Sequence, residues 1–402
     1  MNKSQIKVIN IKNNVKFVLR AIMAQYAEDS AGNPIEKTYA CIKIKNEDTK
    51  VEIIHPLTTE FLLNNWKNAQ FNTMKAPANS IVMFLNFLIN DKDNRVKNLS
   101  ELKSEHLINF LTELSYKRIP KNTVKKHERY IIKFFEFLNE KKIINHSLQV
   151  KNVEYFHSTP KPRLHKLPDE YILTFLEIAY QTDSKIAFAL YLQFFGGLRT
   201  GEICNLRIKD LQLLGDKGEY GFIVDLSEDR ILRKDIVNTS GSSYIKSKRM
   251  QIVFGFKNWS TKFYDKHMSN LKDVKKLSGE TPLFLNQNGL AMTGSNYYYH
   301  FNKIKNIFLQ YLRNSENMAD RNNALVLESE LWSSHIGRGI FSNLLAEEAD
   351  NLYDVSFARG DKSFESVKTY LANTKRMKEK LEQKIDEIYK KKVKEGYENE
   401  FK

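Results

Sequence analysis

The stretch FFGGLRTGEICNLRIKDL, from Phe194 to Leu211, joins an apolar helical run to a new helix through a pair of glycines. A glycine has no Cβ, so the backbone there can approach a ligand closely. Arg199 follows at the junction, where a guanidinium group can donate two hydrogen bonds to one phosphate. A surface arginine after a helix end is the commoner explanation of such a stretch taken alone, so the functional interpretation depends on other segments.

Three further segments carry residues suited to phosphate chemistry. SSYIKSKRMQIVF predicts an alternating strand with Lys246 and Lys248 at a β-hairpin, where a lysine of lowered pKa can act as a general acid. SSHIGRGIFSNLLAEEA predicts His335 and Arg338 on the first turn of one helix, facing the same anion. ARGDKSFESVKTYLANTK predicts a short helix that exposes Tyr370. Each segment alone also has an ordinary structural explanation, because basic strands, H-x-x-R pairs and packed tyrosines are common.

Taken in order, these segments resemble the tyrosine recombinase family, which includes phage integrases, Xer-type resolvases and the integrases of conjugative transposons. The first arginine box of that family, G-L-R-x-x-E-x-x-x-L, is matched by GLRTGEICNL from Gly197 to Leu206. The second box, H-x-x-R, is matched by His335 and Arg338. Tyr370 lies 35 residues beyond that histidine, which is the usual place of the nucleophile.

The resemblance covers most of residues 56–370 and implies a role for each matching residue. Glu202 would orient a residue of the phosphate clamp, and Lys248 is the alternative to Lys246 because the hairpin turn is short. No metal and no other cofactor is implied, because a covalent phosphotyrosine conserves the energy of the broken bond. The implied catalytic set is Arg199 and Arg338 as phosphate clamps, His335 in proton transfer and phosphate binding, Lys246 as general acid, and Tyr370 as nucleophile.

Two positions depart from the family pattern. Asp361, nine residues before Tyr370, stands where the family has a histidine or tryptophan that contacts the phosphate. Since a carboxylate would repel a phosphate, either Asp361 turns away or Lys362 supplies the contact. Gly339 also stands where many members have a second histidine.

The whole chain predicts a mainly α fold with small β-sheets. Residues 1–55 read as a small β-rich unit, because strands at 16–26 and 38–45 flank the turn-rich EDSAGNP. Residues 56–153 predict a helical domain, which the resemblance implies is a core-binding domain. Residues 154–166 predict a basic, proline-containing linker whose plainest role is that of a spacer. Residues 167–402 predict a mixed α/β catalytic domain with a charged helical tail.

The clearest helix of the core-binding domain follows Pro120, with Asn122 or Thr123 expected as its N-cap. One stripe of this helix is apolar and another is basic, so it predicts a buried face and a DNA-binding face. The expected apolar stripe consists of Val124, Ile131, Phe134 and Leu138. The expected DNA-binding residues are Lys121, Lys125, Lys126, Arg129 and Lys133 on the helix, and Lys161 and Arg163 on the linker.

The chain holds 63 Lys and Arg against 48 Asp and Glu, and this net charge of +15 indicates either a polyanionic partner or a generally lysine-rich proteome. The resemblance implies double-stranded DNA sites, a homotetramer on two of them, and accessory DNA-bending proteins. The β-rich unit would be an arm that contacts DNA or a surface that contacts protein. Integration or excision of a mobile element is the expected role. The alternatives are a type IB topoisomerase and a catalytically inactive DNA-binding relative, for which Asp361 is the best argument.

Other classes of protein are disfavoured. The opening MNKSQIKVINIKNN has no apolar core of a signal peptide, and the run from Ile186 to Leu192 is too short to span a bilayer. Cys41 and Cys204 do not form a disulfide framework and cannot supply a zinc site alone. We therefore expect no membrane partner and a bacterial cytoplasmic protein associated with the nucleoid.

Overall fold

A computed structural model describes residues 14–360, apart from 29, 31, 91–95, 97, 147–149, 151–152, 154, 157–162, 229, 234, 237–244, 246–247, 273–277 and 349–351. The side chains of 352–354 are likewise not described. The chain separates into two compact units, Met1–Pro160 and Lys161–Lys402. Five residues with a predicted role lie outside the described residues, namely Lys161, Lys246, Asp361, Lys362 and Tyr370.

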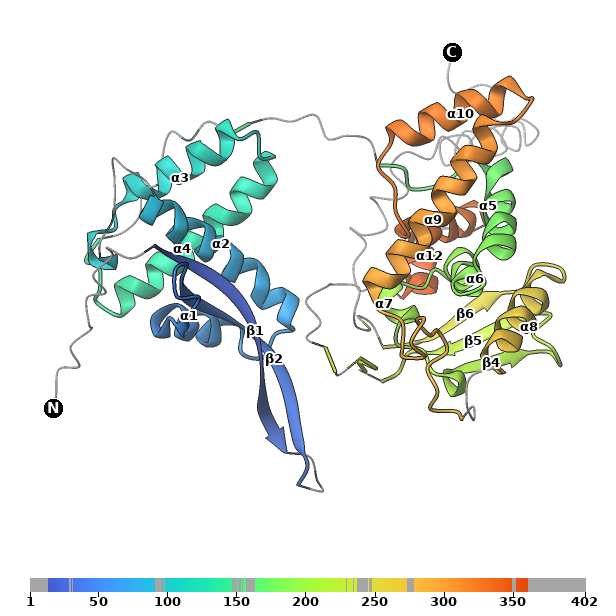
Figure 1. The fold of residues 1–402 in the computed structure, drawn as a ribbon, viewed down its shortest axis with the longest axis horizontal. Coiled ribbons are helices and arrows are strands. Elements are labelled where there is room, and N and C mark those ends of the chain that lie inside the picture. Colours follow the sequence, from blue (N-terminus) through green and yellow to red (C-terminus); the bar gives the residue numbers. More distant parts are fainter. Residues whose placement is uncertain are drawn as a thin grey trace, which may run out of the picture. The chain divides into compact units, whose positions relative to one another are not determined.

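The first unit combines one antiparallel sheet with a set of helices (Figure 1). Strands β1 and β2 pair with Leu19 opposite Ile42, which confirms the predicted hairpin. Ala40 and Ile42 are buried in the same core as Phe61 of the first helix, because a two-stranded ribbon needs a packing partner to be stable. The elements are β1 (Val15–Glu28), β2 (Pro34–Asn46), β3 (Glu52–Ile54), α1 (Pro56–Trp66), α2 (Phe71–Asn90), η1 (Leu99–Glu101), α3 (Ser104–Tyr116) and α4 (Lys121–Glu140).

Helix α4 divides into the two predicted stripes. Its apolar stripe, Val124, Ile131, Phe134 and Leu138, is completely buried. Its basic residues Lys121, Lys125, Lys126, Arg129 and Lys133 are all exposed. The predicted N-cap at Asn122 or Thr123 is wrong, because the carbonyl of Pro120 accepts the first helical bonds and the helix already begins at Lys121.

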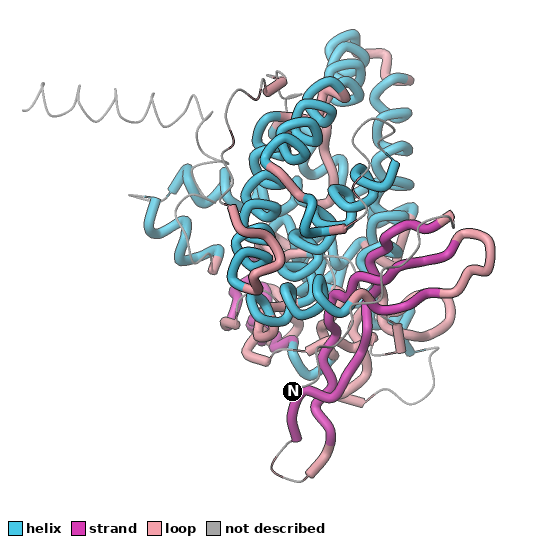
Figure 2. The backbone as a smooth tube through the Cα atoms, turned by 90° about the vertical axis from the view of Figure 1, so that its left-hand side faces the viewer, coloured by secondary structure: helices cyan, strands magenta, loops and turns pink. Residues whose placement is uncertain are grey.

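The second unit combines a set of helices with an antiparallel sheet of strand order β4-β5-β6. Figure 2 shows the strands of both sheets in magenta among the cyan helices, which is the mainly α fold with small sheets that the sequence predicts. The elements are α5 (Asp169–Thr182), α6 (Ala187–Gly196), α7 (Thr200–Ile203), η2 (Ile208–Asp210), β4 (Leu211–Leu214), β5 (Gly221–Asp225), β6 (Met250–Phe254), α8 (Trp259–Lys272), α9 (Gly294–Arg313), α10 (Met318–Ser329), α11 (His335–Glu348) and α12 (Leu352–Arg359).

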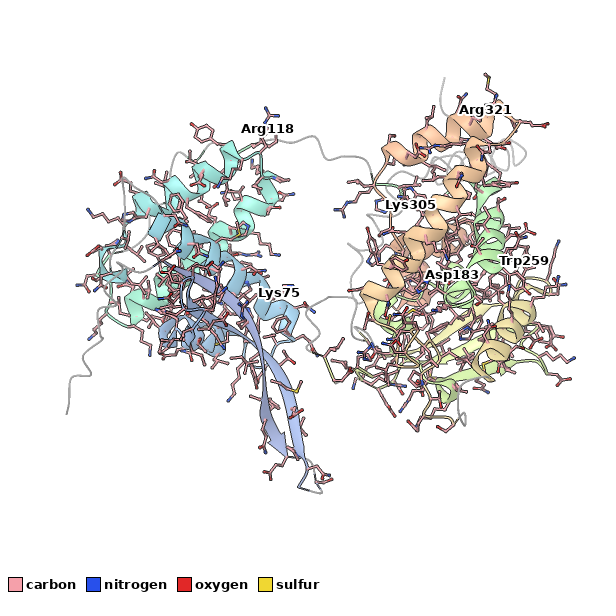
Figure 3. The ribbon with its side chains drawn as sticks, in the orientation of Figure 1. Lys75, Arg118, Asp183, Trp259, Lys305 and Arg321 are labelled. Carbon is pink, nitrogen blue, oxygen red and sulfur yellow. The ribbon has the colours of Figure 1, made fainter. Side chains whose placement is uncertain are left out.

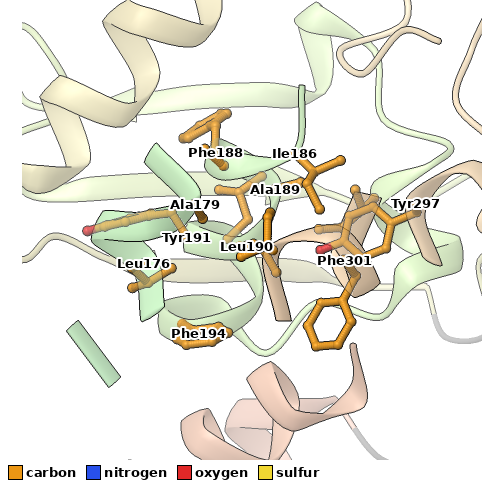
Figure 4. Packing of buried hydrophobic residues seen from close by; sticks show 14 of the residues in the cluster. Leu176, Ala179, Ile186, Phe188, Ala189, Leu190, Tyr191, Phe194, Tyr297 and Phe301 are labelled. Atoms are coloured by element: carbon orange, nitrogen blue, oxygen red, sulfur yellow. The ribbon is translucent and has the colours of Figure 1, made fainter. Parts of the chain in front are cut away.

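Helix α6 lies at the centre of this unit and is apolar on nearly every side. Phe188, Leu190, Tyr191 and Phe194 are all completely buried, as the close view of the core shows (Figure 4). The hydroxyl of Tyr191 donates to the carbonyl of Phe254 at 2.9 Å, which ties the helix to the end of β6. The turn that follows α6 therefore starts from a well-packed element.

In the described part of the chain, every helix falls short of the length and apolar character needed to cross a membrane.

Candidate active site

The turn between α6 and α7 positions Arg199. Gly197 ends α6 with a φ of 63°, in the left-handed region that glycine adopts without strain. A Cβ at this position would lie 2.3 Å from a ring carbon of Phe341, so the space also requires glycine. Arg199 is the residue before α7, and its backbone N–H donates to Glu202 Oε2 at 2.8 Å. Arg199 thus stands at the amino end of α7, with its side chain only 19% exposed.

Glu202 binds two arginines in the interior of the unit. Its Oε1 atom lies 2.9 Å from Nη1 of Arg199. Arg249 forms a second, two-pronged pair with the same carboxylate, at 2.8 Å and 3.0 Å. Burial by itself would raise the pKa of the Glu202 carboxyl, but the hydrogen bonds and charges of Arg249 and Arg199 outweigh it and hold that pKa below its usual value. The carboxylate therefore stays ionised and orients both guanidinium groups.

Arg249 and Gln251 also lie in this candidate site, and the sequence interpretation did not name them. Arg249 Nε donates to Gln251 Oε1 at 2.7 Å, and Gln251 Nε2 donates to the carbonyl of Ala358, at the end of α12, at 2.9 Å. A Cβ on Gly360 would lie 2.0 Å from Cδ of Arg249, so the chain passes directly over the arginine there. The available signal was strand alternation, since Gln251 occupies a buried position of β6 where an apolar residue is usual.

His335 and Arg338 are the first and fourth residues of α11, one turn apart as predicted. Their surroundings differ, because His335 is exposed whereas Arg338 is only 2% exposed. The guanidinium of Arg338 donates to the carbonyl of Gly197 and, at 3.0 Å, to the carbonyl of Arg359. Arg338 therefore joins the end of α6, just before Arg199, to the end of α12.

Contacts also fix the segment that immediately precedes α11. Lys305, labelled on α9 in Figure 3, places its ammonium 4.1 Å from the ring centre of Trp332 and 3.2 Å from the carbonyl oxygen of that residue. Burial lowers the pKa of Lys305. The hydroxyl of Ser334 lies 3.1 Å from that of Thr200, so the residue before His335 touches the residue after Arg199. Helices α7 and α11 are thus joined at their amino ends.

The structure explains why position 339 has no side chain. A Cβ on Gly339 would lie 1.7 Å from the carbonyl oxygen of His165, in the segment that precedes α5. Because that neighbour is backbone, it cannot move aside by changing a rotamer. The second histidine of many recombinases has no room at this position.

Of the two candidate lysines and the candidate nucleophile, the structure describes Lys248. Lys248 is exposed and lies two residues before β6, so the strand is shorter than predicted and this lysine belongs to the β5–β6 connection. The proposed positions of Lys246, Asp361 and Tyr370 remain predictions, since these residues lie outside the described part of the chain. Within the described ranges, no three histidine, cysteine or acidic side chains come together as a metal site requires.

The basic face of α4 is organised by aromatic residues. Nζ of Lys125 lies 4.4 Å from the ring centre of Tyr155, and the hydroxyl of that tyrosine donates to Glu128 at 2.6 Å. Hydrogen bonds to Tyr155 and Glu128 raise the pKa of Lys125. Lys133 similarly lies 5.1 Å from the ring of Trp66. On the second unit, Arg163 is exposed and its backbone pairs with that of Leu331.

No protein-family model matches this chain, and no curated protein matches it. Solved structures do match in fold. The Tn1549 transposon integrase in complex with transposon right end DNA is 17% identical with a TM-score of 0.56, over 81% of this chain and 98% of that one. XerH site-specific recombinase bound to difH substrate is 17% identical with a TM-score of 0.51, over 81% and 83%. A lambda integrase dimer bound to a COC' core site is 10% identical with a TM-score of 0.52, over 80% and 96%.

These structures are tyrosine recombinases, and the likeness holds over about four-fifths of this chain. The chain therefore has the tyrosine-recombinase fold. At such low identity the likeness concerns the fold, and the activity has to be argued from the residues of the site.

Proposed function

We propose that this protein is a site-specific DNA recombinase that cuts and rejoins DNA strands through a 3′-phosphotyrosyl intermediate. The observation that carries the proposal is the convergence of the two arginine boxes. Arg338 of α11 donates to the carbonyl of Gly197, two residues before Arg199, although the two arginines are far apart in sequence. A pair of arginines at one place, in the fold of DNA-bound recombinases, is suited to hold one phosphate.

The proposed reaction uses the residues of this chain alone. The phenolic oxygen of Tyr370 attacks the scissile phosphorus, and the bond from phosphorus to the 5′-oxygen breaks. The departing oxygen takes its proton from Lys246, or from Lys248 as the alternative. Arg199 and Arg338 bear the charge that develops on the phosphate, a preorganised role worth about 3–4 kcal/mol per donor.

The second half of the reaction restores the DNA backbone. The 5′-hydroxyl of another strand attacks the phosphotyrosine, the tyrosine leaves, and His335 assists the proton transfers and the binding of the phosphate. The number of phosphodiester bonds is unchanged, so no external source of energy is needed. Glu202 holds Arg199 in place throughout, because its carboxylate is buried and already paired with that side chain.

The partner is duplex DNA bearing recombination sites. The five exposed cations of α4 and Arg163 would bind the phosphate backbone, joined by Lys161 of the linker. A homotetramer on two DNA sites would perform the exchange, with accessory proteins that bend the DNA, in a bacterial cytoplasm and in association with the nucleoid. Integration or excision of a mobile element is the role we favour, because transposon and phage integrases share the fold.

A covalent trapping experiment tests the proposal. The substrate is a nicked duplex made from the DNA that flanks the gene, in which the cleaved end diffuses away and the adduct accumulates. We expect the wild-type chain to form a protein–DNA adduct, and Tyr370→Phe and Arg199→Ala to form none. An adduct that survives Tyr370→Phe would exclude this nucleophile. Relaxation of supercoiled DNA that lacks the site would instead indicate a type IB topoisomerase.

A further inference from the structure

We propose that the hydroxyl groups of Thr200 and Ser334 form a positioning contact, which sets the spacing of Arg199 and His335 around the scissile phosphate. The inference rests on the proposed recombinase function and adds two residues to which neither arginine box assigns a role. Thr200 directly follows Arg199 in the chain, and Ser334 directly precedes His335.

The hydroxyl pair lies in the interior of the second unit. Oγ1 of Thr200 and Oγ of Ser334 are 3.1 Å apart, and either can be the donor. The two residues are only 7% and 6% exposed, so water does not readily replace the bond. A buried hydroxyl that loses its partner also loses free energy, because it was removed from water to form that bond. The bond is therefore expected to persist in the folded protein.

A second bond joins the same two parts of the chain. The guanidinium of Arg338 donates to the carbonyl of Gly197, two residues before Arg199, whereas the hydroxyl bond begins one residue after Arg199. On the side of α11, the two bonds start before and after His335 in the chain. Both side chains of the proposed site are thus bracketed by two parallel connections between the α6–α7 turn and the first turn of α11.

Two connections restrict motion that one would allow. If only the bond from Arg338 remained, the start of α11 could pivot about it. The contact of Lys305 with the carbonyl of Trp332, at 3.2 Å, does not replace the hydroxyl bond, because it ties the segment before α11 to α9. The hydroxyl pair alone reaches from the residue beside His335 to the residue beside Arg199.

A pivot at this place would weaken the hold on the phosphate. A displacement of about 1 Å can reduce a rate by about a hundredfold. Valine has the shape of threonine without the hydroxyl, so we expect Thr200→Val to slow cleavage by about 10- to 100-fold. Thr200→Ser keeps the hydroxyl and should restore the rate to within about threefold of wild type. Adding Ser334→Ala to Thr200→Val should slow cleavage no further, because both changes remove the same bond.

The decisive measurement compares two suicide duplexes that differ in charge at the scissile phosphate. One has the natural phosphodiester, and the other has a methylphosphonate, in which an uncharged methyl group replaces one non-bridging oxygen. An arginine stabilises the neutral group less, because less negative charge faces it. We expect Arg199→Ala and Thr200→Val each to slow cleavage of the phosphodiester clearly more than cleavage of the methylphosphonate, relative to wild type on the same duplex.

Ser260→Ala is the matched control. Ser260 of α8 is completely buried, and its hydroxyl donates to the carbonyl of Glu219 at 3.4 Å, away from both arginine boxes. We expect its ratio of phosphodiester to methylphosphonate cleavage rates to equal that of the wild type. If Thr200→Val does not fold, Ser334→Ala tests the same ratio from the other side of the bond.

Different outcomes would count against different claims. Equal slowing of Thr200→Val on both duplexes, or a Thr200→Ser variant as slow as Thr200→Val, would overturn the positioning role. If the wild-type chain cleaves only the phosphodiester, the double variant decides, and additive slowing would overturn the role. If the wild-type chain forms no adduct with the phosphodiester, the proposed recombinase function itself fails.

Discussion

Arg249 and Glu202 form a two-pronged ion pair, with Nη1 2.8 Å from Oε1 and Nη2 3.0 Å from Oε2. Glu202 is completely buried and also pairs with Arg199, so one carboxylate serves two guanidinium groups. A buried pair of charges is stable only while it is complete, because an unpaired charge in the interior loses its solvation without compensation. This relationship links Arg199, at the amino end of α7, to Arg249, which lies just before β6.

Removal of the shared carboxylate should therefore be strongly destabilising. We expect Glu202→Ala to lower the free energy of unfolding by about 3–5 kcal/mol, measured by urea denaturation. Glu113→Ala is the control, since its pair with Lys117 is largely exposed and should change stability by at most about 1 kcal/mol. Similar losses of unfolding free energy in the two variants would show that the buried ion pair contributes no more to stability than the exposed one.

Gly339 should tolerate no side chain. We expect Gly339→Ala to destabilise the second unit by about 1–3 kcal/mol or more, because its Cβ would overlap the carbonyl oxygen of His165. Gly279→Ala is the control, since the three atoms nearest to a Cβ there all belong to the Lys209 side chain, the nearest at 3.1 Å. Thermal denaturation of the two variants gives the comparison. A Gly339→Ala protein as stable as the control would show that the segment before α5 can move away.

His55 should make the stability of the first unit depend on pH. Burial lowers the pKa of His55 to about 4, below its ordinary value of 6.5. The unfolded chain therefore takes up a proton before the folded one as the pH falls. Above pH 6.5 the neutral His55 makes its full contribution to the free energy of unfolding. This contribution, up to about 3 kcal/mol, is lost as the pH falls from about 6.5 to about 4.

NMR titration of the histidine-labelled full chain measures this pKa directly. His55→Asn assigns the resonance and keeps an N-cap acceptor for Thr58 of α1, while it removes the titrating ring. We expect this variant to lose less stability than the wild type between pH 7 and 5. A resonance that titrates near pH 6.5 would contradict the prediction.

The basic face of α4 should determine how DNA binding depends on salt. The logarithm of the affinity falls as the logarithm of the salt concentration rises, and each phosphate contact adds about 0.9 to the steepness of this fall. We expect Lys126→Gln, Arg129→Gln and Lys133→Gln together to reduce the steepness by about 2–3. Lys103→Gln and Lys117→Gln, at the two ends of α3, should leave the slope unchanged. Fluorescence anisotropy at several salt concentrations measures both. An unchanged slope in the triple variant would remove α4 from the DNA interface.

Much of the fold follows from local sequence patterns. The apolar stripe of α4 specifies a helix with one buried face, because periodicity in the chain determines which face can be buried. The turn-rich EDSAGNP between two strand-like segments specifies the hairpin of β1 and β2. The boundary at Pro120 was misplaced because a backbone carbonyl replaced the expected side-chain cap. The resemblance to the recombinase family likewise depended on short motifs and their spacing.

The surroundings of the candidate site depended on tertiary packing. Spacing alone predicted that His335 and Arg338 face one anion, whereas packing against α6 and α12 buries Arg338 and leaves His335 exposed. No local pattern showed that Arg249 binds Glu202, since the two residues lie in different elements.

Arg199 shows most clearly which features follow from the sequence and which depend on the tertiary structure. The glycines before it and the glutamate after it are visible in the sequence, because the turn and its cap are formed by neighbouring residues. The burial of its partner Glu202, the contact of that carboxylate with Arg249 and the approach of Arg338 to Gly197 were decided by the tertiary structure. Long-range contacts of this kind depend on how whole elements pack, and no single segment specifies them.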